Sequence, residues 1–322
     1  MYMLDVVTFG ESMVLFSPER PGRLRHVHTY SKQLGGAESN VAIGLSRLGV
    51  RAGWFSKLGR DEFGYYIQSA IQGEGVDTSR VLFDEQAPTG LYLKEYVREG
   101  MVNVMYYRHM SAASQMSPSD LDESYIASAK ILHITGITPA LSSSCAETVE
   151  AAIDIARHHG VKIVFDPNIR LKLFRSKEEA RAVLREIADK SDIVLAGKGE
   201  GEVLTGDTDV QEIASEFHRT GVKTVVIKME DKGAYYSSDA EKGMVEAFSV
   251  KQVIDPVGAG DGFAAGFLAS LLREEGLKQA VKAGNAVGAM MVQSYGDMEG
   301  LPTWDELEEF LNKVNDTEQV RR

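Results

Sequence analysis

The residues with the clearest chemical potential lie in the segment 255–263, which reads Asp-Pro-Val-Gly-Ala-Gly-Asp-Gly-Phe. Small and apolar residues recur at helical spacing over residues 263–272, which predicts a helix that begins near Ala259 or Gly260. Gly258, Ala259 and Gly260 have little or no side chain, so the unpaired amides at this helix start could approach a phosphate closely, and the helix dipole favours its charge. The segment therefore indicates an anion site, although an ordinary glycine-rich helix start has the same pattern.

Asp261 would lie at the rim of this anion site, where a carboxylate is electrostatically unfavourable. Its presence is explained if it accepts a proton from a hydroxyl group that attacks phosphorus. The alternative is an acidic residue that only stabilises the N-terminus of the helix.

Two further loops contain residues that could bind a small polar ligand. Gly35 and Gly36 precede a predicted helix and permit close approach of a ligand to the backbone, and Asn40 would project from the first turn of that helix. Arg170 follows a strand-like run at 162–165 and could bind a carboxylate or a phosphate through two parallel hydrogen bonds. The alternatives are a capping or loop-tying role for Asn40 and a surface salt bridge for Arg170.

Charged residues also follow the next two strand-like runs. Glu200 is the candidate for a water-mediated contact with Mg²⁺, because this ion keeps several waters and takes few protein ligands. An acidic helix N-terminus is the simple alternative. Asp166, which directly follows the earlier run at 162–165, could hold a loop in place or bind a water molecule that is coordinated to magnesium. Lys228 ends the run at 224–228, and a nucleotide could lie along the backbone near Gly233.

These loops need a scaffold, and most of the sequence alternates short apolar runs with amphipathic segments. The strand-like runs are at 5–9, 52–57, 131–134, 162–165, 193–196 and 224–228, and amphipathic helical segments lie at 145–158, 177–188 and 210–218. This alternation predicts an α/β fold with a parallel sheet and helices on both faces. Ligands bind such sheets at the carboxyl ends of the strands.

Two segments, at about 13–34 and 88–110, interrupt the alternation. Residues 89–97 and 102–107 have the pattern of a hairpin across 98–100. We expect these segments to form a small β-sheet that covers one side of the main domain as a lid, although edge hairpins with a purely structural use would have the same pattern. The predicted division is an α/β domain of residues 1–12, 36–87 and 111–322 and a β lid of residues 13–35 and 88–110.

Composition restricts the class of protein. The 322 residues are 43% hydrophobic and 25% charged, with a formal net charge of −12. An acidic chain without a basic stripe is not expected to bind nucleic acid. Its apolar runs are too short to span a bilayer, its first residues lack a signal-peptide pattern, and its single cysteine, Cys145, cannot form an internal disulfide. We therefore expect a cytoplasmic protein with no membrane partner.

Together these blocks resemble the ribokinase-like, or PfkB, family of carbohydrate kinases. The N-terminal signature of the family is similar to residues 35–42, 48–49 and 57–64, and its C-terminal signature is similar to residues 255–263. The resemblance covers nearly the whole chain. It implies a ribokinase-like fold, in which helices flank a central, mostly parallel sheet and a small β-sheet forms a lid. It also implies ATP and Mg²⁺ as cofactors.

The resemblance implies roles for individual residues. Asp261 would be the general base, and the amides of Gly258, Ala259 and Gly260 would stabilise the transferring phosphoryl group. Glu200 would help to place Mg-ATP through water. The family often uses a monovalent cation, and K⁺ near Asp255 is the candidate here. The nucleotide would contact this turn and Lys198, Lys228, Gly233 and Asn285. The sequence departs from the general family pattern at Gly197, Lys228, Glu230 and Pro256–Val257.

Within the family, residues 8–11, 35–40, 106–114 and 166–170 are most similar to the ketodeoxygluconate kinases. By this likeness the sugar-acid site comprises Gly35, Gly36, Asn40, Tyr92, Tyr106, Arg108, Arg170 and Asp297. A substrate carboxylate needs a cation remote from the base, and two of these residues are arginines.

The predicted reaction is ATP-dependent phosphorylation of 2-keto-3-deoxygluconate at its 6-hydroxyl, with lid closure excluding water. A fructokinase or another PfkB-family sugar kinase is the alternative, and an inactive sugar- or nucleotide-binding sensor is the alternative from a different class. Similar kinases often pair through their lids, so we expect a homo-oligomer.

Overall fold

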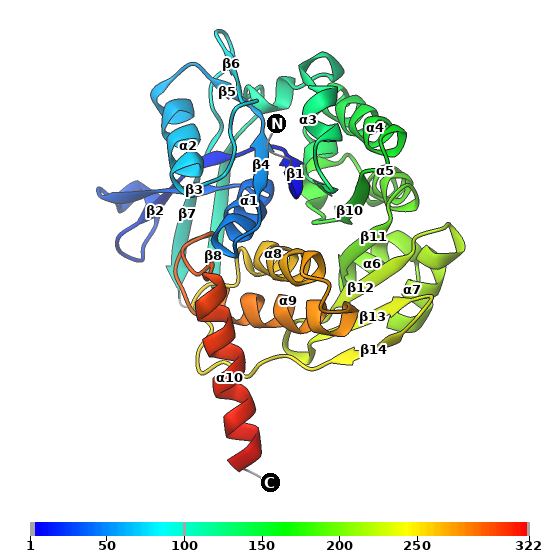
Figure 1. Ribbon diagram of the computed structural model, residues 1–322. Helices are drawn as coiled ribbons and strands as arrows, with labels where there is room; N and C mark the ends of the chain where they lie inside the picture. The colour runs from blue at the N-terminus through cyan, green and yellow to red at the C-terminus, as the bar shows by residue number, and fades with distance from the viewer. Residues whose placement is uncertain (1–3, 99–100, 321–322) are drawn as a thin grey trace.

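The structure of the protein is a computed structural model that describes residues 4–98 and 101–320. Within these residues the central sheet has eight strands, in the order β14-β13-β12-β11-β10-β9-β1-β4 (Figure 1). The parallel strands are β4 (Ala52–Phe55), β1 (Val6–Phe9), β9 (Ile131–Thr135), β10 (Lys162–Asp166), β11 (Ile193–Gly197) and β12 (Thr224–Lys228). The predicted parallel sheet is therefore confirmed. At the β14 edge of the sheet, β13 (Ala234–Ser238) pairs antiparallel with β12 and with β14 (Lys242–Val245), which the alternation did not indicate.

Helices cover both faces of this sheet. One face packs against α1 (Ala37–Arg47), α8 (Ala259–Leu272) and α9 (Leu277–Met291), with α2 (Glu62–Gly73) beside them. The other face packs against α3 (Glu123–Ala127), α4 (Ser143–His158), α5 (Lys177–Asp189), α6 (Lys198–Thr205) and α7 (Val210–Arg219). The side chains of successive strand residues point to opposite faces of the sheet. Val6 therefore packs in the hydrophobic core on the α1, α8 and α9 side, and Val7 packs in the core on the other side.

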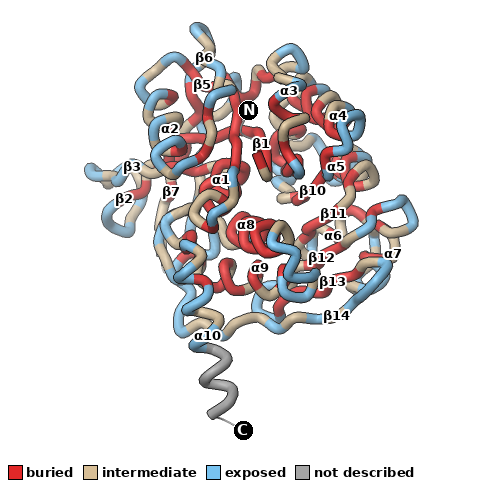
Figure 2. The backbone as a smooth tube through the Cα atoms, viewed as in Figure 1, coloured by how far each residue is buried: buried red, intermediate tan, exposed pale blue. Residues whose placement is uncertain are grey.

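Helix α8 is buried along most of its length between α1 and α9 (Figure 2). Its sequence is apolar or small on every side, which is the pattern of a helix with no solvent face. It begins at Ala259, as predicted, and Gly258 caps it in the left-handed region with φ 80°. The packing of α8 therefore fixes the position of the glycine-rich turn at its start.

A second sheet has the order β3-β2-β7-β8 and lies to one side of the first (Figure 1). We call it the lid sheet; its strands are β2 (Met13–Pro18), β3 (Tyr30–Gly35), β7 (Leu91–Arg98) and β8 (Met101–Tyr107). Both pairs are antiparallel, and β7 with β8 is the pair predicted as a hairpin; β2 joins β7 in parallel. Residues 99–100 of the predicted turn lie outside the described residues. The division of the chain into a lid and a main domain stays a prediction.

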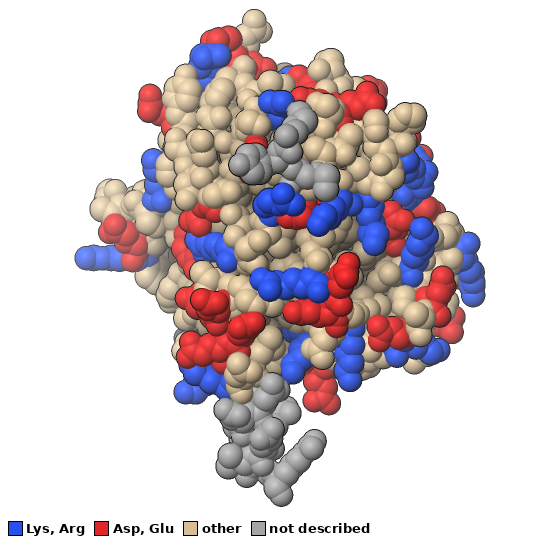
Figure 3. Space-filling view, viewed as in Figure 1, with Lys and Arg blue, Asp and Glu red and all other residues tan. Residues whose placement is uncertain are grey.

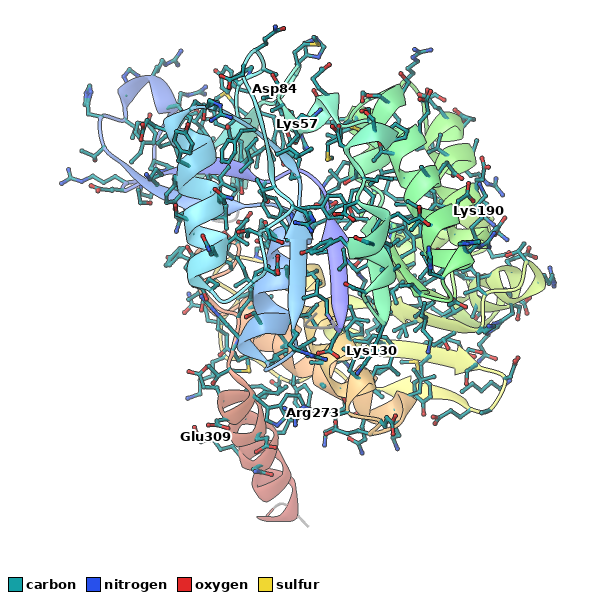
Figure 4. All side chains as sticks on the ribbon, turned by 45° about the horizontal axis from the view of Figure 1, so that its top comes forward. Lys57, Asp84, Lys130, Lys190, Arg273 and Glu309 are labelled. Atoms are coloured by element: carbon teal, nitrogen blue, oxygen red, sulfur yellow. The ribbon has the colours of Figure 1, made fainter. Side chains whose placement is uncertain are left out.

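The remaining elements are short or peripheral. Strands β5 (Lys57–Gly59) and β6 (Leu82–Asp84) form a small parallel pair. Short 3₁₀ turns occur at Leu24–His26, Ala113–Gln115, Pro118–Asp120, Thr138–Ala140, Leu171–Leu173 and Glu230–Lys232. Helix α10 (Trp304–Val320) is attached to α8 by Arg273, whose guanidinium lies 3.5 Å from the centre of the Trp304 ring (Figure 4).

Charged side chains of both signs lie on the molecular surface (Figure 3). Acidic and basic side chains are interspersed on the face shown in Figure 3. Over residues 4–98 and 101–320, no helix combines the length and the apolar character that crossing a bilayer requires.

Candidate active site

The site is built around Asp261, in the first turn of α8. Its side chain is buried and accepts a hydrogen bond from Asn40, whose Nδ2 lies 2.8 Å from Asp261 Oδ2. Asn168, in the loop after β10, places its own Nδ2 3.4 Å from Asp261 Oδ1. Asn40 Oδ1 is buried without a hydrogen-bond partner among the described residues, so it is available to accept from a ligand hydroxyl. The N-termini of α1 and α8 therefore meet at one carboxylate.

Burial raises the pKa of Asp261 to about 7. The hydrogen bond from Asn40 opposes this shift, the Asp166 carboxylate adds to it, and the Arg170 guanidinium opposes it. A carboxylate with a pKa near neutrality suits proton abstraction at neutral pH better than an ordinary exposed aspartate.

The turn before α8 has the close contacts that a glycine-rich anion site requires. A Cβ atom on Gly258 would lie 2.5 Å from the backbone oxygen of Asp297, so a larger residue would displace one of the two loops. A Cβ on Gly260 would lie 3.7 Å from Lys228 Nζ, which places an ammonium group beside the amides of the helix start, where Ala259 N–H makes one long bond, 3.4 Å, to the Pro256 oxygen. Backbone amides, the helix dipole and a lysine thus converge on one space.

Lys228, Asp166 and Glu200 form a charged cluster next to this turn. Lys228 Nζ donates to Asp166 Oδ2 at 2.6 Å. Burial lowers the pKa of Lys228, but the carboxylates of Asp166 and Glu200 outweigh it and raise the pKa above its usual value. Burial raises the pKa of Glu200, and the charge of Asp166 adds to this effect. The cluster contains both charge signs that binding a magnesium polyphosphate requires.

The hydrogen bonds of Glu200 bear on its predicted contact with a magnesium-bound water. Its Oε2 accepts from the Gly197 amide at 2.7 Å and its Oε1 accepts from the Ile169 amide at 2.8 Å. Each oxygen keeps a lone pair, which fits a contact through water better than a direct ligand role. Among the residues the structure describes, no three acidic, histidine or cysteine side chains group as a metal site.

The other predicted nucleotide residues lie at two places. Lys198 starts α6, and its Nζ is 3.7 Å from Glu202 Oε1 on the exposed side of that helix. Gly233 has φ 91° and leads into β13, where a Cβ would lie 2.0 Å from the oxygen of Val245. The side-chain amide of Asn285, on α9, donates to the same Val245 oxygen at 3.1 Å. Gly233 and Asn285 therefore converge on the end of β14, whereas Lys198 lies apart from them.

On the opposite side of Asp261, the lid sheet meets the loop that follows α9. Tyr92 OH donates to Asp297 Oδ2 at 2.6 Å, and the Tyr106 ring stacks on the Tyr92 ring with centroids 5.5 Å apart. A Cβ on Gly35 would lie 1.9 Å from Tyr92 OH. A Cβ on Gly36 would lie 2.7 Å from a backbone oxygen at residue 11. Gly35 thus permits close packing of β3 against Tyr92 of β7, and Gly36 permits close approach of residue 11 to the start of α1.

The two predicted carboxylate-binding arginines have different environments. Arg170 is exposed, and within the described residues its guanidinium has no hydrogen bond or ion pair, so the surface salt bridge considered as an alternative is not found there. Arg108 is mostly buried and forms an ion pair with Glu11 Oε2. Ser111 Oγ donates to the other oxygen of Glu11 at 2.6 Å. Arg108 Nε is buried without a hydrogen-bond partner among the described residues, so both arginines keep donors that a substrate could use, and Arg170 is the one without an ion pair.

Sequence reasoning missed two residues of this site. Asn168 adopts φ 37°, which non-glycine residues seldom do, and the motif after β10 gave no sign that its side chain would face Asp261. Lys94 is buried and ion-paired with both Asp255 and Asp297. The signal for Lys94 was its place on β7, because residues 92 and 94 of a strand share one face.

Known proteins resemble this chain over most of its length. Residues 3–304 match the model of the "pfkB family carbohydrate kinase" family. The 2-dehydro-3-deoxygluconokinase of Bacillus subtilis (strain 168) is 43% identical over 319 residues, 99% of this chain and 98% of that protein. A candidate ribokinase II of E. coli, solved with ATP and Mg²⁺, has a TM-score of 0.90 at 28% identity, covering 97% of this chain and all of the other.

A double-mutant fructokinase of Vibrio cholerae O395, solved with fructose, ADP and a potassium ion, has a TM-score of 0.83 at 27% identity. It covers 97% of this chain and 99% of the other. These likenesses confirm the predicted ribokinase-like fold.

Proposed function

The chain belongs to the pfkB family of carbohydrate kinases, and on this premise we propose that it uses ATP and Mg²⁺ to phosphorylate 2-keto-3-deoxygluconate at the 6-hydroxyl. One observation carries the proposal: a buried carboxylate, Asp261, with a pKa of about 7, lies in the first turn of the helix that follows a glycine-rich anion site. An exposed arginine without an ion pair among the described residues, Arg170, acts electrostatically on the same carboxylate.

In the proposed reaction, Asp261 accepts the proton of the 6-hydroxyl as that oxygen bonds to the γ-phosphorus. The bond between the γ-phosphorus and the β,γ-bridging oxygen breaks, and ADP leaves. Asn40 holds Asp261 through its 2.8 Å hydrogen bond and so orients the base before the sugar binds. Gly258, Ala259 and Gly260 offer their amides to the transferring group, where charge develops.

The cluster beside the turn would position the nucleotide. Lys228 Nζ lies next to Gly260 and can contact the phosphates while it stays paired with Asp166. Glu200 would hold a magnesium-bound water, since both of its oxygens already accept a backbone hydrogen bond. Bound Mg²⁺ supplies neutralisation of the phosphate charge.

The choice of a sugar acid depends on Arg170. A neutral sugar needs no guanidinium, whereas a carboxylate gains two charge-assisted hydrogen bonds from one. The donors of Arg108 are committed in part to Glu11, so we assign it a positioning role at the sugar end. The relative from B. subtilis supports this substrate class.

The lid sheet would complete the site and join two subunits. Tyr92 and Tyr106 belong to its strands, so their proposed contact with the sugar requires the lid to lie over the site. On β8 the exposed side chains Val102, Met105 and Tyr107 lie on both faces of the strand. Apolar side chains at such positions favour pairing of two lids in a homo-oligomer.

A fructokinase is the second candidate, because the V. cholerae fructokinase shares the fold over nearly the whole chain. The test is a comparison of kcat/KM for 2-keto-3-deoxygluconate, fructose and ribose with saturating Mg-ATP. We expect kcat/KM for the sugar acid to exceed the values for both neutral sugars by more than about tenfold. A site that binds a carboxylate contains a cationic side chain, and a neutral sugar leaves that side chain unpaired. A higher value for fructose would overturn the sugar-acid assignment, and no turnover of any sugar would favour the sensor alternative.

A further inference from the structure

A lysine is buried between two aspartates that adjoin the glycine-rich turn at 258–260. Lys94 is 1% exposed, and its Nζ lies 3.0 Å from Asp255 Oδ2 and 2.8 Å from Asp297 Oδ1. The other oxygens of these carboxylates also have donors, since Asp255 Oδ1 accepts from the Val257 amide at 3.0 Å and Asp297 Oδ2 accepts from Tyr92 OH. All four carboxylate oxygens are therefore hydrogen-bonded.

This arrangement keeps the lysine charged. Burial lowers the pKa of Lys94, but Asp297 and Asp255 outweigh it and raise the pKa above its usual value. Two buried carboxylates with no cation between them would be strongly unfavourable, and removal of one member of such a group leaves uncompensated charge. A fixed positive charge is thus part of the folded protein at this position.

The cluster bears directly on the anion site. Asp255 begins the segment that forms the turn, and its hydrogen bond to Val257 sets the path of the backbone into Gly258. The backbone oxygen of Asp297 packs against Gly258, where even a Cβ atom would come within 2.5 Å. Lys94 holds both aspartates from the lid strand β7, so it links the lid sheet to both loops that shape the turn.

The residues near Asp255 do not fit a potassium ion. K⁺ is held by oxygen atoms and needs space between them. Each carboxylate oxygen of Asp255 and Asp297 already accepts one hydrogen bond, and the donor that bridges the two carboxylates is itself a cation, Lys94. A second cation beside Lys94 would meet electrostatic repulsion at close range. The expectation of a K⁺ site at Asp255 thus disagrees with the structure.

We infer that the Lys94 ammonium group is the resident monovalent cation of this turn, so that phosphoryl transfer requires no K⁺ or other dissolved monovalent cation. The inference rests on the proposed function, in which the turn at 258–260 holds the transferring phosphoryl group. Lys94 is a positioning residue, because it acts through Asp255 and Asp297 and contacts no reacting atom.

The first test uses the wild-type protein. Its turnover is measured with Mg-ATP and the best sugar substrate in KCl and in tetramethylammonium chloride at equal ionic strength, at about 100 mM so that screening is matched. We expect rates that agree within about twofold, a small difference in barrier. Activation of about tenfold or more by K⁺ would overturn the inference. If no sugar is turned over, the proposed function fails, and the inference is then tested by the affinity for a non-hydrolysable ATP analogue in the two salts. Affinities that agree within about twofold support the inference, and an affinity about tenfold or more higher in K⁺ overturns it.

The second test removes the cation. Lys94→Ala leaves space between the two carboxylates, and we expect its turnover in tetramethylammonium chloride to fall more than about tenfold. K⁺ or methylammonium should then restore at least part of the rate, whereas a purely structural role gives a loss that no small cation reverses. Such an unrescued loss in a folded variant contradicts the inference. If Lys94→Ala does not fold, the wild-type measurement decides alone.

The matched control is Lys190→Ala. Lys190 lies on the outer side of the helical layer that contains α5, away from the lid sheet (Figure 4), and pairs with Glu150 and Glu186 at the surface. Its loss removes a lysine and its ion pairs without touching the turn, so its rate should match the wild type in both salts.

Discussion

Asn40 Nδ2 donates a 2.8 Å hydrogen bond to Asp261 Oδ2, so a residue in the first turn of α1 controls a carboxylate in the first turn of α8. These residues are 221 positions apart, and α1 packs against α8 in the same core. The amide stabilises the charged form of a carboxyl group whose burial favours the neutral form. Helix packing therefore controls the ionisation of the proposed base.

The first prediction concerns pH. Because burial raises the pKa of Asp261 to about 7 and a general base must be ionised, kcat/KM should rise from acid to neutral pH with a midpoint near 7. In Asn40→Ala the charged form loses its donor, so this limb should move to higher pH by about one unit. Asn168→Ala is the control, because its donor is 3.4 Å away and its loss should shift the limb less. Equal profiles for wild type and Asn40→Ala would refute the coupling.

The second prediction concerns the base itself. Asp261→Asn keeps the shape of the side chain but cannot accept the proton, so kcat should fall about 10²- to 10⁴-fold while KM for ATP changes little. The folded pKa lies above the unfolded value, so Asp261 favours folding at acid pH, and this contribution is lost as pH rises through 7. The variant should therefore melt at a higher temperature than wild type at pH 8. Near-wild-type turnover would exclude the base role.

The third prediction concerns the carboxylate of the substrate. Arg170→Ala removes the exposed guanidinium, so KM for the sugar acid should rise about tenfold or more while KM for ATP changes little. The guanidinium also lowers the pKa of Asp261, so the acid limb should move to higher pH. Lys198→Ala is the control, because Lys198 pairs with Glu202 on α6 and should not affect the sugar. Similar increases in both KM values would argue against carboxylate recognition.

Much of the fold follows from local pattern, because strand and helix periods are properties of consecutive residues. The runs at 131–134 and 162–165 became β9 and β10 with boundaries shifted by one residue. The pattern did not indicate that β13 and β14 would be antiparallel, since alternation carries no information about strand direction.

Only the site residues that lie within a short contiguous motif could be predicted from the sequence. The segment 255–263 marked the anion turn and Asp261, and the structure places them together at the start of α8. It gave no sign of Lys94, because an ion pair with Asp255 joins residues 161 positions apart in different sheets and loops. Nor could sequence show that Arg108 would pair with Glu11 while Arg170 stayed exposed, since both depend on how the loops pack.

The last prediction concerns the close packing of Gly35 against Tyr92 within the lid sheet, next to the start of α1. A Cβ on Gly35 would lie 1.9 Å from Tyr92 OH, so Gly35→Ala must displace the tyrosine from Asp297. Such overpacking costs about 1–3 kcal/mol. We therefore expect a lower melting temperature and a raised KM for the sugar.

Gly73→Ala is the matched control for this prediction, because Gly73 ends α2 with no atom within 4 Å of a Cβ built on it. It makes the same chemical change in open space, and alanine is the better helix former by about 1 kcal/mol. Its melting temperature should equal or exceed that of wild type, with unchanged kinetics. If Gly35→Ala matched this control in both stability and KM, Tyr92 would not be held against Asp297 by the close packing at Gly35, and the proposed closure of the lid over the sugar would lose its structural basis.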